Sequence, residues 1–330
     1  MHVTFYNRRP MATNFSVERV FLDIHTALPP DIQPRVVVAR FESRGFLKRL
    51  YNTLAVLPFQ GEVNHVTGDV HYLTYLLRKE RTLLTILDCV LLHRLTGWQK
   101  QLIFFLWYWL PEKRCTLISV ISESTRRELL TYLPQAQDKI RVVHCPVSKD
   151  FRFQPKAFNA SRPVLLQIGT GTNKNLLRVA EALNGIQCHL RIIGRLTPEQ
   201  ETVLQNNAID YSAVANISDS QIIEEYCNTD MVVFASTYEG FGLPIIEAQA
   251  TGRAVVTSDL LSMPEVAGAG VCLVDPFDIN SIRTGIRMVI EDAAYREQLI
   301  AEGLQNVTRF QPEVIAQQYV ALYHELLSQS

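Results

Sequence analysis

Two glutamates, Glu239 and Glu247, flank a segment whose composition suits a ligand site. The segment reads Gly-Phe-Gly-Leu-Pro-Ile-Ile and follows an apolar run, 231–235, that we expect to form a buried strand. Its glycines allow close backbone approach, its proline suits a first helical position, and free N–H groups at a helix start favour a phosphate. Because a carboxylate is repelled by phosphate, we interpret both glutamates as acceptors for sugar or ribose hydroxyls. An ordinary strand-to-helix turn with solvated glutamates is the alternative.

A second loop, 167–175, reads Gln-Ile-Gly-Thr-Gly-Thr-Asn-Lys-Asn between an apolar run and a helical pattern. Its glycines relax the backbone, its threonines offer hydroxyl donors, and its lysine places a positive charge near a helix start. Taken alone, a Gly-x-Gly before a helix is more often simple turn chemistry. The residues that we expect to hold a diphosphate here are Gly169, Thr170, Gly171, Thr172 and Lys174.

The stretch 236–252, Ser-Thr-Tyr-Glu-Gly-Phe-Gly-Leu-Pro-Ile-Ile-Glu-Ala-Gln-Ala-Thr-Gly, resembles the donor site of the family 4 retaining glycosyltransferases, glycosyl transferases group 1. Ser258, Pro264-Glu265 and 274–276 extend the resemblance, and the loop 167–175 precedes it in the order that the family requires. The resemblance covers the C-terminal half well and the N-terminal half only through looser segments. It implies the α/β fold called GT-B, in which the parallel sheets of two Rossmann-like domains face a central cleft.

The resemblance also implies roles for individual residues. Lys174 would stabilise the leaving group, and Glu239 is the second catalytic candidate. Donor contacts would come from Gly240, Phe241, Gly242, Leu243 and Glu247, with Val214 and Ile217 on the nucleotide base. A helix cap at Ser218 or Asp219 is an alternative for the last segment. The family commonly carries a loop arginine that is missing here, and Arg195 is a substitute only if it points into the cleft.

The N-terminal half offers candidates for the acceptor side at expected strand ends and at the start of the first helix. They are Ser16, Arg19, His65, Asp69, His71 and Asp88. The family usually has a histidine where this chain has Leu87, and His65 or His71 could compensate for it. A single histidine is more often structural than catalytic.

Composition favours two domains in a reducing compartment. The chain has 330 residues, of which 47% are hydrophobic and 20% charged. Its six cysteines form no Cys-x-x-Cys pair, and we find neither a basic-apolar leader nor an apolar run long enough to span a bilayer. These features predict a cytoplasmic protein with no nucleic-acid partner.

Charge is distributed unevenly along the chain. Lys+Arg minus Asp+Glu gives 20 − 13 = +7 for residues 1–150 and 12 − 20 = −8 for residues 151–330. The basic residues Arg40, Arg44, Lys48 and Arg49 lie among apolar ones, which suits a peripheral contact with an anionic membrane on its inner face. A solvated helix face is the alternative.

Strand-like and helical patterns alternate in both halves, which predicts parallel sheets. We expect an acceptor-binding domain over 1–150, a nucleotide-sugar-binding domain over 151–311, and a final helix over 312–330. By resemblance, this helix crosses back onto the N-terminal domain.

The sequence contains no Asp-x-Asp, the acidic pair with which many transferases hold a diphosphate through a metal ion. We therefore expect no metal or other cofactor, and a hexosyl transfer from a nucleotide diphosphate sugar to a saccharide or lipid-linked saccharide. The resemblance implies retention of anomeric configuration and favours mannose or glucose. Two alternatives stay open: a non-catalytic nucleotide-sugar-binding subunit, motivated by Leu87 and the missing arginine, and an epimerase.

Overall fold

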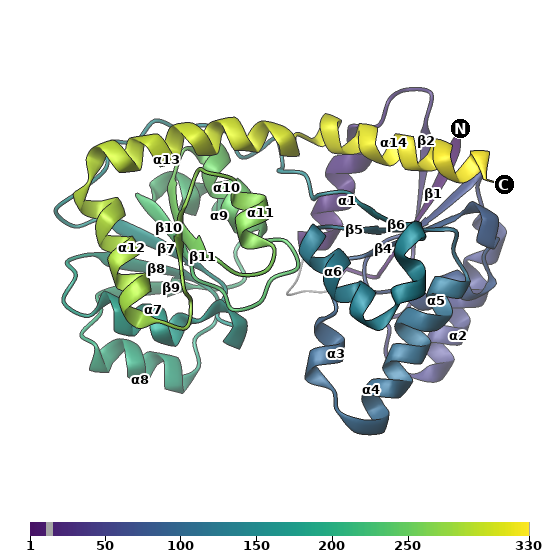
Figure 1. Ribbon diagram of the computed structural model, residues 1–330, viewed down its shortest axis with the longest axis horizontal. Coiled ribbons are helices and arrows are strands. Elements are labelled where there is room, and N and C mark those ends of the chain that lie inside the picture. Colours follow the sequence, from purple (N-terminus) through teal and green to yellow (C-terminus); the bar gives the residue numbers. More distant parts are fainter. Residues whose placement is uncertain (11–15, 330) are drawn as a thin grey trace. The chain divides into compact units, whose positions relative to one another are not determined.

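The computed structural model describes residues 1–10 and 16–329, shown in Figure 1. The chain forms two compact units: residues 1–146 together with the segment from Pro312, and residues 147–311. We expected the division after residue 150, and it falls slightly earlier, after residue 146. The C-terminal helix belongs to the first unit.

The first unit contains a six-stranded parallel sheet in the order β2-β1-β3-β4-β5-β6. The strands are β1 (His2–Asn7), β2 (Gln33–Val38), β3 (Val63–Val66), β4 (Thr82–Ile86), β5 (Leu117–Val120) and β6 (Ile140–Val142). The helices are α1 (Ser16–Thr26), α2 (Phe46–Ala55), α3 (Val90–Arg94), α4 (Gly97–Phe104), the π-helix η4 (Phe105–Trp109), α5 (Leu110–Lys113), α6 (Glu123–Tyr132) and α14 (Pro312–Ser328).

Helix α14 packs on this sheet, although its sequence is remote from it. Tyr323 is fully buried, and its hydroxyl lies 3.0 Å from Nδ1 of His65 in β3. Tyr319 of the same helix is also buried and packs against the His65 ring at 5.1 Å. These contacts attach the C-terminal helix to the core of the first unit.

The second unit contains another six-stranded parallel sheet, in the order β12-β11-β10-β7-β8-β9. The strands are β7 (Val164–Ile168), β8 (His189–Ile193), β9 (Tyr211–Val214), β10 (Met231–Phe234), β11 (Ala254–Ser258) and β12 (Cys272–Val274). The helices are α7 (Leu176–Leu183), α8 (Pro198–Asn206), α9 (Asp219–Asn228), α10 (Leu243–Thr251), α11 (Met263–Ala267), α12 (Ile279–Glu291) and α13 (Ala293–Asn306).

The order of the second sheet explains where a ligand site can form. The first strand, β7, lies between β8 and β10, so the chain proceeds in opposite directions across the sheet from this point. Loops that leave the carboxyl ends of β7 and β10 therefore diverge from a shared edge, which is where doubly wound sheets bind ligands. Both sequence motifs lie on these two loops.

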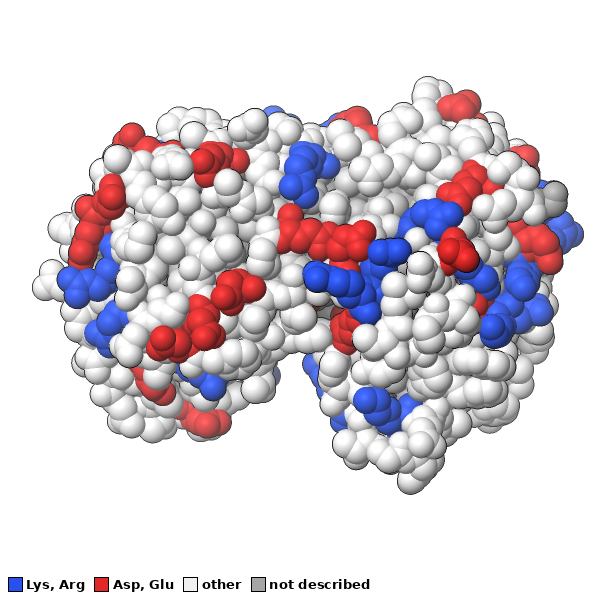
Figure 2. Space-filling model, viewed as in Figure 1, with Lys and Arg blue, Asp and Glu red and all other residues white. Residues whose placement is uncertain are grey.

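The surface carries both signs of charge, as Figure 2 shows, separated by uncharged areas. Among the described residues, every helix is too short or too polar to cross a lipid bilayer.

Candidate functional site

The loop after β7 has the backbone shape that its glycines and asparagines favour. Gly169 has φ +86°, and a Cβ there would lie 3.0 Å from carbon atoms of the Lys174 side chain. Asn175 is also left-handed, at φ 60°, and its amide donates to the carbonyls of Ala235, at 2.9 Å, and Pro276, at 2.7 Å. This buried asparagine attaches the loop to the segments that follow β10 and β12.

The loop after β10 is bonded directly to the first loop. The Thr237 amide donates to the Asn173 carbonyl at 2.8 Å, and the Asn173 side chain donates to the Tyr238 carbonyl at 3.0 Å. The structure thus brings the two predicted motifs together at one edge of the sheet.

Lys174 and Glu239 form an ion pair at this junction. Nζ of Lys174 lies 2.6 Å from Oε1 of Glu239, and the Asn173 amide donates to the same oxygen at 3.3 Å. The lysine ammonium also lies 4.7 Å from the centre of the Phe234 ring. Both side chains keep some solvent exposure, 21% and 15%, so a ligand can reach the pair from one side. The sequence predicted both residues but not their direct contact.

Helix α10 begins at the end of the same loop. Gly242 adopts φ +107°, which an L side chain rarely adopts, and Pro244 follows in the first turn. Ser262 fixes this loop from α11's side, because its hydroxyl contacts the carbonyls of Glu239 at 3.0 Å and Phe241 at 2.9 Å. Sequence reasoning missed Ser262, since a lone serine carries no signal of so distant a contact.

Phe241 contributes to the core rather than to a ligand surface. Its side chain is 4% exposed and packs edge-on against Phe310 at 5.8 Å. Its predicted donor contact is therefore limited to backbone atoms. Gly240 and Leu243 flank it on the loop and at the first position of α10.

Glu247 lies one turn further along α10 and has a buried partner. The hydroxyl of Tyr226, in α9, donates to Oε2 of Glu247 at 2.5 Å. Burial raises the pKa of Tyr226 well above its usual range, and the Glu247 carboxylate adds to this effect. The tyrosine therefore stays protonated and acts as a fixed donor to the glutamate.

The remaining donor-side candidates lie on the loop after β7 and beside the neighbouring strands β8 and β9. Gly171 and Thr172 are exposed, whereas the Thr170 hydroxyl is occupied by the Arg195 carbonyl at 2.8 Å. The Arg195 side chain itself is exposed. Gly194 packs so closely on Thr170 that a Cβ would lie 2.7 Å from its methyl carbon.

Val214 ends β9, and Ile217 follows in the short loop before α9; both are half-buried. Ser218 caps α9 through a capping box with Gln221, which confirms the helix-cap interpretation of this segment. Contacts of Val214 and Ile217 with a base stay a prediction.

The structure corrects the assignment of His65 to the acceptor side. Its ring is 0% exposed, and its two nitrogens contact the hydroxyls of Tyr323 at 3.0 Å and Thr85 at 2.7 Å. Burial holds its pKa well below the usual value. His65 is a satisfied core histidine, and no ligand can reach it in this fold.

His71 is likewise almost wholly buried. Its Nδ1 lies 2.7 Å from the Trp107 carbonyl, and burial lowers its pKa. Its Nδ1–H therefore donates a hydrogen bond to the Trp107 carbonyl inside the protein, and His71 is a poor acceptor-side candidate. Neither histidine replaces the one that Leu87 displaces.

A buried arginine links the acceptor-side candidates that remain near β1 and β3. Arg8 follows β1 and lies 2.6 Å from Glu18 of α1 and 3.6 Å from Asp69 after β3. Sequence reasoning did not identify Arg8 or Glu18. Asp69 is half exposed, which keeps it accessible.

The other acceptor-side candidates are less concentrated. Arg19 pairs with Asp23 within α1 at 3.4 Å, and Asp88 accepts the Val90 amide at 3.0 Å. Ser16 begins α1, but its side chain lies outside the described residues.

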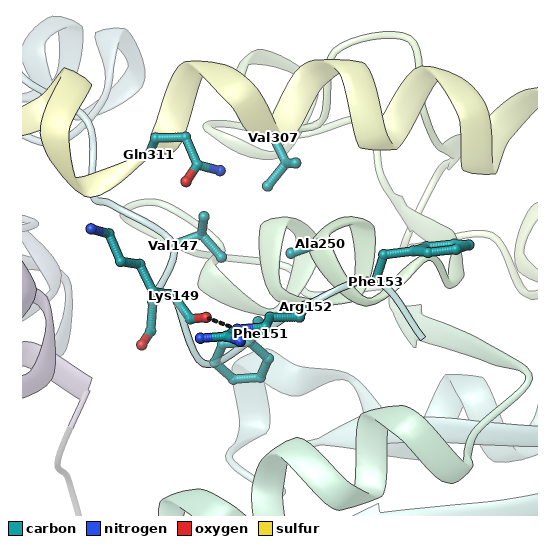
Figure 3. Close-up of a pocket in the computed structure, with 9 residues that line it drawn as sticks. Val147, Lys149, Phe151, Arg152, Phe153, Ala250, Val307 and Gln311 are labelled. Atoms are coloured by element: carbon teal, nitrogen blue, oxygen red, sulfur yellow. Dashed lines mark hydrogen bonds between the residues drawn. The ribbon is translucent and has the colours of Figure 1, made fainter. Parts of the chain in front are cut away.

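A hollow of about 440 Å³ in the second unit is separate from these loops (Figure 3). The residues that line it include Lys149, Phe151, Arg152, Phe153 and Gln311, and Arg152 donates to the Lys149 carbonyl at 3.1 Å. No predicted donor-site residue lines it, so this hollow is not the chemically favoured site.

The family model that matches this chain covers the second unit, which carries both loops. Residues 148–306 match the family model described as glycosyl transferases group 1. The O-antigen chain mannosyltransferase B of Escherichia coli is 36% identical over 107 residues, which cover 32% of this chain and 28% of that protein. The MMP alpha-(1->4)-mannosyltransferase of Mycolicibacterium hassiacum is 23% identical over 251 residues, covering 70% of this chain and 60% of the relative. The chain spans little more than a quarter of the first of these relatives.

Solved structures resemble the fold over nearly its whole length. Anabaena Alr3699/HepE in complex with UDP and glucose aligns with a TM-score of 0.79 at 15% identity, covering 98% of this chain and 100% of that one. A glycosyltransferase from Rickettsia africae aligns with a TM-score of 0.77 at 16% identity, covering 100% and 99%. The two six-stranded parallel sheets, each flanked by helices, are the GT-B fold.

Proposed function

We propose, for a chain whose residues 148–306 form a glycosyl transferases group 1 domain, that the protein transfers a hexosyl group from a nucleotide diphosphate sugar to a saccharide or lipid-linked saccharide. The observation that carries the proposal is the Lys174–Glu239 pair, held at 2.6 Å where the β7 and β10 loops join. A cation, a hydroxyl acceptor and a helix start at one edge are what a sugar diphosphate requires.

The proposed roles follow from the contacts. Lys174 and the first N–H groups of α10 neutralise charge on the departing diphosphate, while Glu239 accepts hydrogen bonds from sugar hydroxyls. Glu247, oriented by Tyr226, accepts those of the ribose.

We propose a front-face mechanism with retention. The acceptor hydroxyl attacks the anomeric carbon on the side where the bond to the diphosphate oxygen breaks. That departing oxygen takes the hydroxyl proton, so the new glycosidic bond keeps the original configuration. No metal or other cofactor is required in this scheme, because protein groups supply the charge that stabilises the leaving group.

Mannose and glucose are the proposed donor sugars. The similar proteins from Escherichia coli and Mycolicibacterium hassiacum are named as mannosyltransferases, and the Anabaena structure is described with UDP and glucose. We place the protein in the cytoplasm, with the basic first unit against the inner face of an anionic membrane where a lipid-linked acceptor would be found.

The experiment that tests this function measures nucleoside diphosphate release from GDP-mannose, UDP-glucose and ADP-glucose, with crude saccharide and lipid-linked acceptor fractions. We expect release from one donor, unchanged by EDTA, with retained configuration in the NMR spectrum of the product. Inversion would contradict the mechanism, and loss of activity in EDTA would contradict metal independence.

A non-catalytic nucleotide-sugar-binding subunit is the second candidate. It is favoured by Leu87, where the family has histidine, and by the burial of His65 and His71, which leaves neither to compensate. This candidate predicts donor binding without release of the nucleoside diphosphate with any acceptor fraction.

A further inference from the structure

Helix α2 of the first unit is amphipathic in the reverse sense. Its buried residues are polar, Asn52 and Thr53, whereas Phe46, Leu47, Leu50 and Leu54 are 77%, 77%, 43% and 51% exposed. The spacing of 46, 50 and 54 places these side chains on one outward stripe. A surface helix of a globular protein normally turns its apolar stripe toward the protein core.

The polar face of α2 is fixed in place by specific bonds. The Asn52 amide donates to the Phe41 carbonyl at 2.8 Å and to the Tyr72 hydroxyl at 3.0 Å, and its carbonyl accepts the Phe41 amide at 3.1 Å. Rotating the helix to bury its apolar stripe would break all three bonds. The exposure of the stripe is therefore a property of the fold.

A second outward apolar stripe lies on α4 and η4. Trp98, Leu102 and Phe105 are 71%, 47% and 46% exposed and follow one another at intervals of four and three residues. No residue of α4 is buried. Arg49 of α2 lies 4.4 Å from the centre of the Trp107 ring of η4, so the two elements are joined. Helices α2, α4 and α5 are labelled in Figure 1, and η4 is the segment between α4 and α5.

Basic side chains accompany the α2 stripe. Arg44, before the helix, is 85% exposed, and Lys48 is exposed within it. Arg40 lies 5.8 Å from the centres of the Phe41 and Tyr51 rings and donates to the Tyr51 hydroxyl at 3.2 Å. Residues 1–150 carry a net +7 by side-chain count, 20 − 13. Apolar side chains among cations are the pattern that binds the interface of an anionic bilayer.

We propose that the outward stripe of α2 is an insertion surface for an anionic lipid bilayer, and that Trp98, Leu102 and Phe105 extend it. Leucines and phenylalanines enter the acyl boundary, while Arg44 and Lys48 meet lipid phosphates. The assignment rests on the proposed function in one respect: such a surface would hold the enzyme where a lipid-linked acceptor lies. Charge complementarity favours an anionic bilayer over a second copy of the chain, because the same basic side chains of two copies would face and repel each other.

The test measures co-sedimentation of the full chain with vesicles of phosphatidylcholine and phosphatidylglycerol at 70:30, and with vesicles of phosphatidylcholine alone. The variant is Phe46→Ser with Leu50→Ser. The matched control is Leu22→Ser, which changes an exposed leucine of α1 in the same unit. Melting temperature establishes that each variant is folded, which surface substitutions should allow.

We expect the wild type and the control to bind the anionic vesicles, the double variant to bind at least about tenfold more weakly, and 0.5 M salt to weaken binding. Equal binding by the folded double variant would overturn the proposal. Self-association of the wild type that the double variant abolishes, without vesicle binding, would replace the bilayer with a second copy. Because no donor is present, the outcome is independent of the proposed transferase activity.

Discussion

At the scale of single residues, the Lys174–Glu239 pair makes the sharpest prediction. Glu239→Gln keeps the shape of the side chain but removes its charge, so we expect a loss of roughly 100-fold in kcat, typical of a transition-state contact. Stability should change by only about 0–1 kcal/mol, because the pair is partly exposed. Glu199→Gln, on an exposed position of α8, is the matched control. An unchanged kcat in Glu239→Gln would remove this glutamate from catalysis.

Tyr226 makes a second prediction at this scale. Tyr226→Phe removes the hydroxyl that donates to Glu247 while keeping the buried ring. We expect nucleoside diphosphate affinity to fall roughly tenfold, within the usual worth of a hydrogen bond to a charged group. Calorimetric titration measures this, with Tyr211→Phe on β9 as the control. If Tyr226→Phe binds the nucleoside diphosphate as tightly as the wild type and the control do, Tyr226 has no positioning role.

The sequence predicted Lys174, Glu239 and Glu247 because each lies in a short motif beside a strand end. It could not predict their partners. Tyr226 reaches Glu247 across 21 residues, and Ser262 reaches Glu239 across 23, so no local pattern records these bonds. His65 shows the opposite failure: a polar residue suggests a surface site until its buried partners are known.

At the scale of elements, the start of α10 depends on Gly242. Gly242→Ala forces a side chain into a left-handed position, φ +107°, 3.1 Å from Cδ1 of Ile245. We expect a loss of about 1–3 kcal/mol in unfolding free energy and much weaker donor binding. Gly185→Ala is a matched control, since Gly185 is also left-handed but a Cβ there meets nothing within 4 Å. Should Gly242→Ala bind donor normally, α10's start would not form the site.

Strands with a strong local pattern can be predicted from the sequence, and strand β3 cannot. The run that became β10 is wholly apolar, and those that became β7 and β11 are mostly apolar, as expected for strands buried on both faces. Strand β3 has only four residues, and Asn64 and His65 interrupt its apolar pattern. Both are buried because distant hydroxyls satisfy them, a condition that propensity cannot reveal.

At the scale of the molecule, the half-buried His25 and the buried His65 and His71 make the first unit sensitive to acid. Burial lowers the pKa of His25 to about 4 and also lowers those of His65 and His71. The unfolded chain, whose histidines titrate near 6.5, then binds more protons than the folded one below that pH. Stability is full above pH 6.5 and falls as pH drops towards 4.

Urea unfolding should therefore give a lower free energy of unfolding at pH 5.0 than at pH 7.5, with His25 contributing about 2 kcal/mol to the difference. His25→Gln should reduce this difference, whatever its effect at pH 7.5. Equal stability of the wild type at both pH values would contradict the burial of neutral histidines.

The central claim is that the joined β7 and β10 loops bind a nucleoside diphosphate, and calorimetric titration of UDP, GDP and ADP tests it most directly. We predict that one of the three binds with a single site, and that Lys174→Ala and Glu247→Ala each weaken this binding at least about tenfold while remaining folded. Absence of binding by all three, or equal affinity in both variants, would contradict the claim.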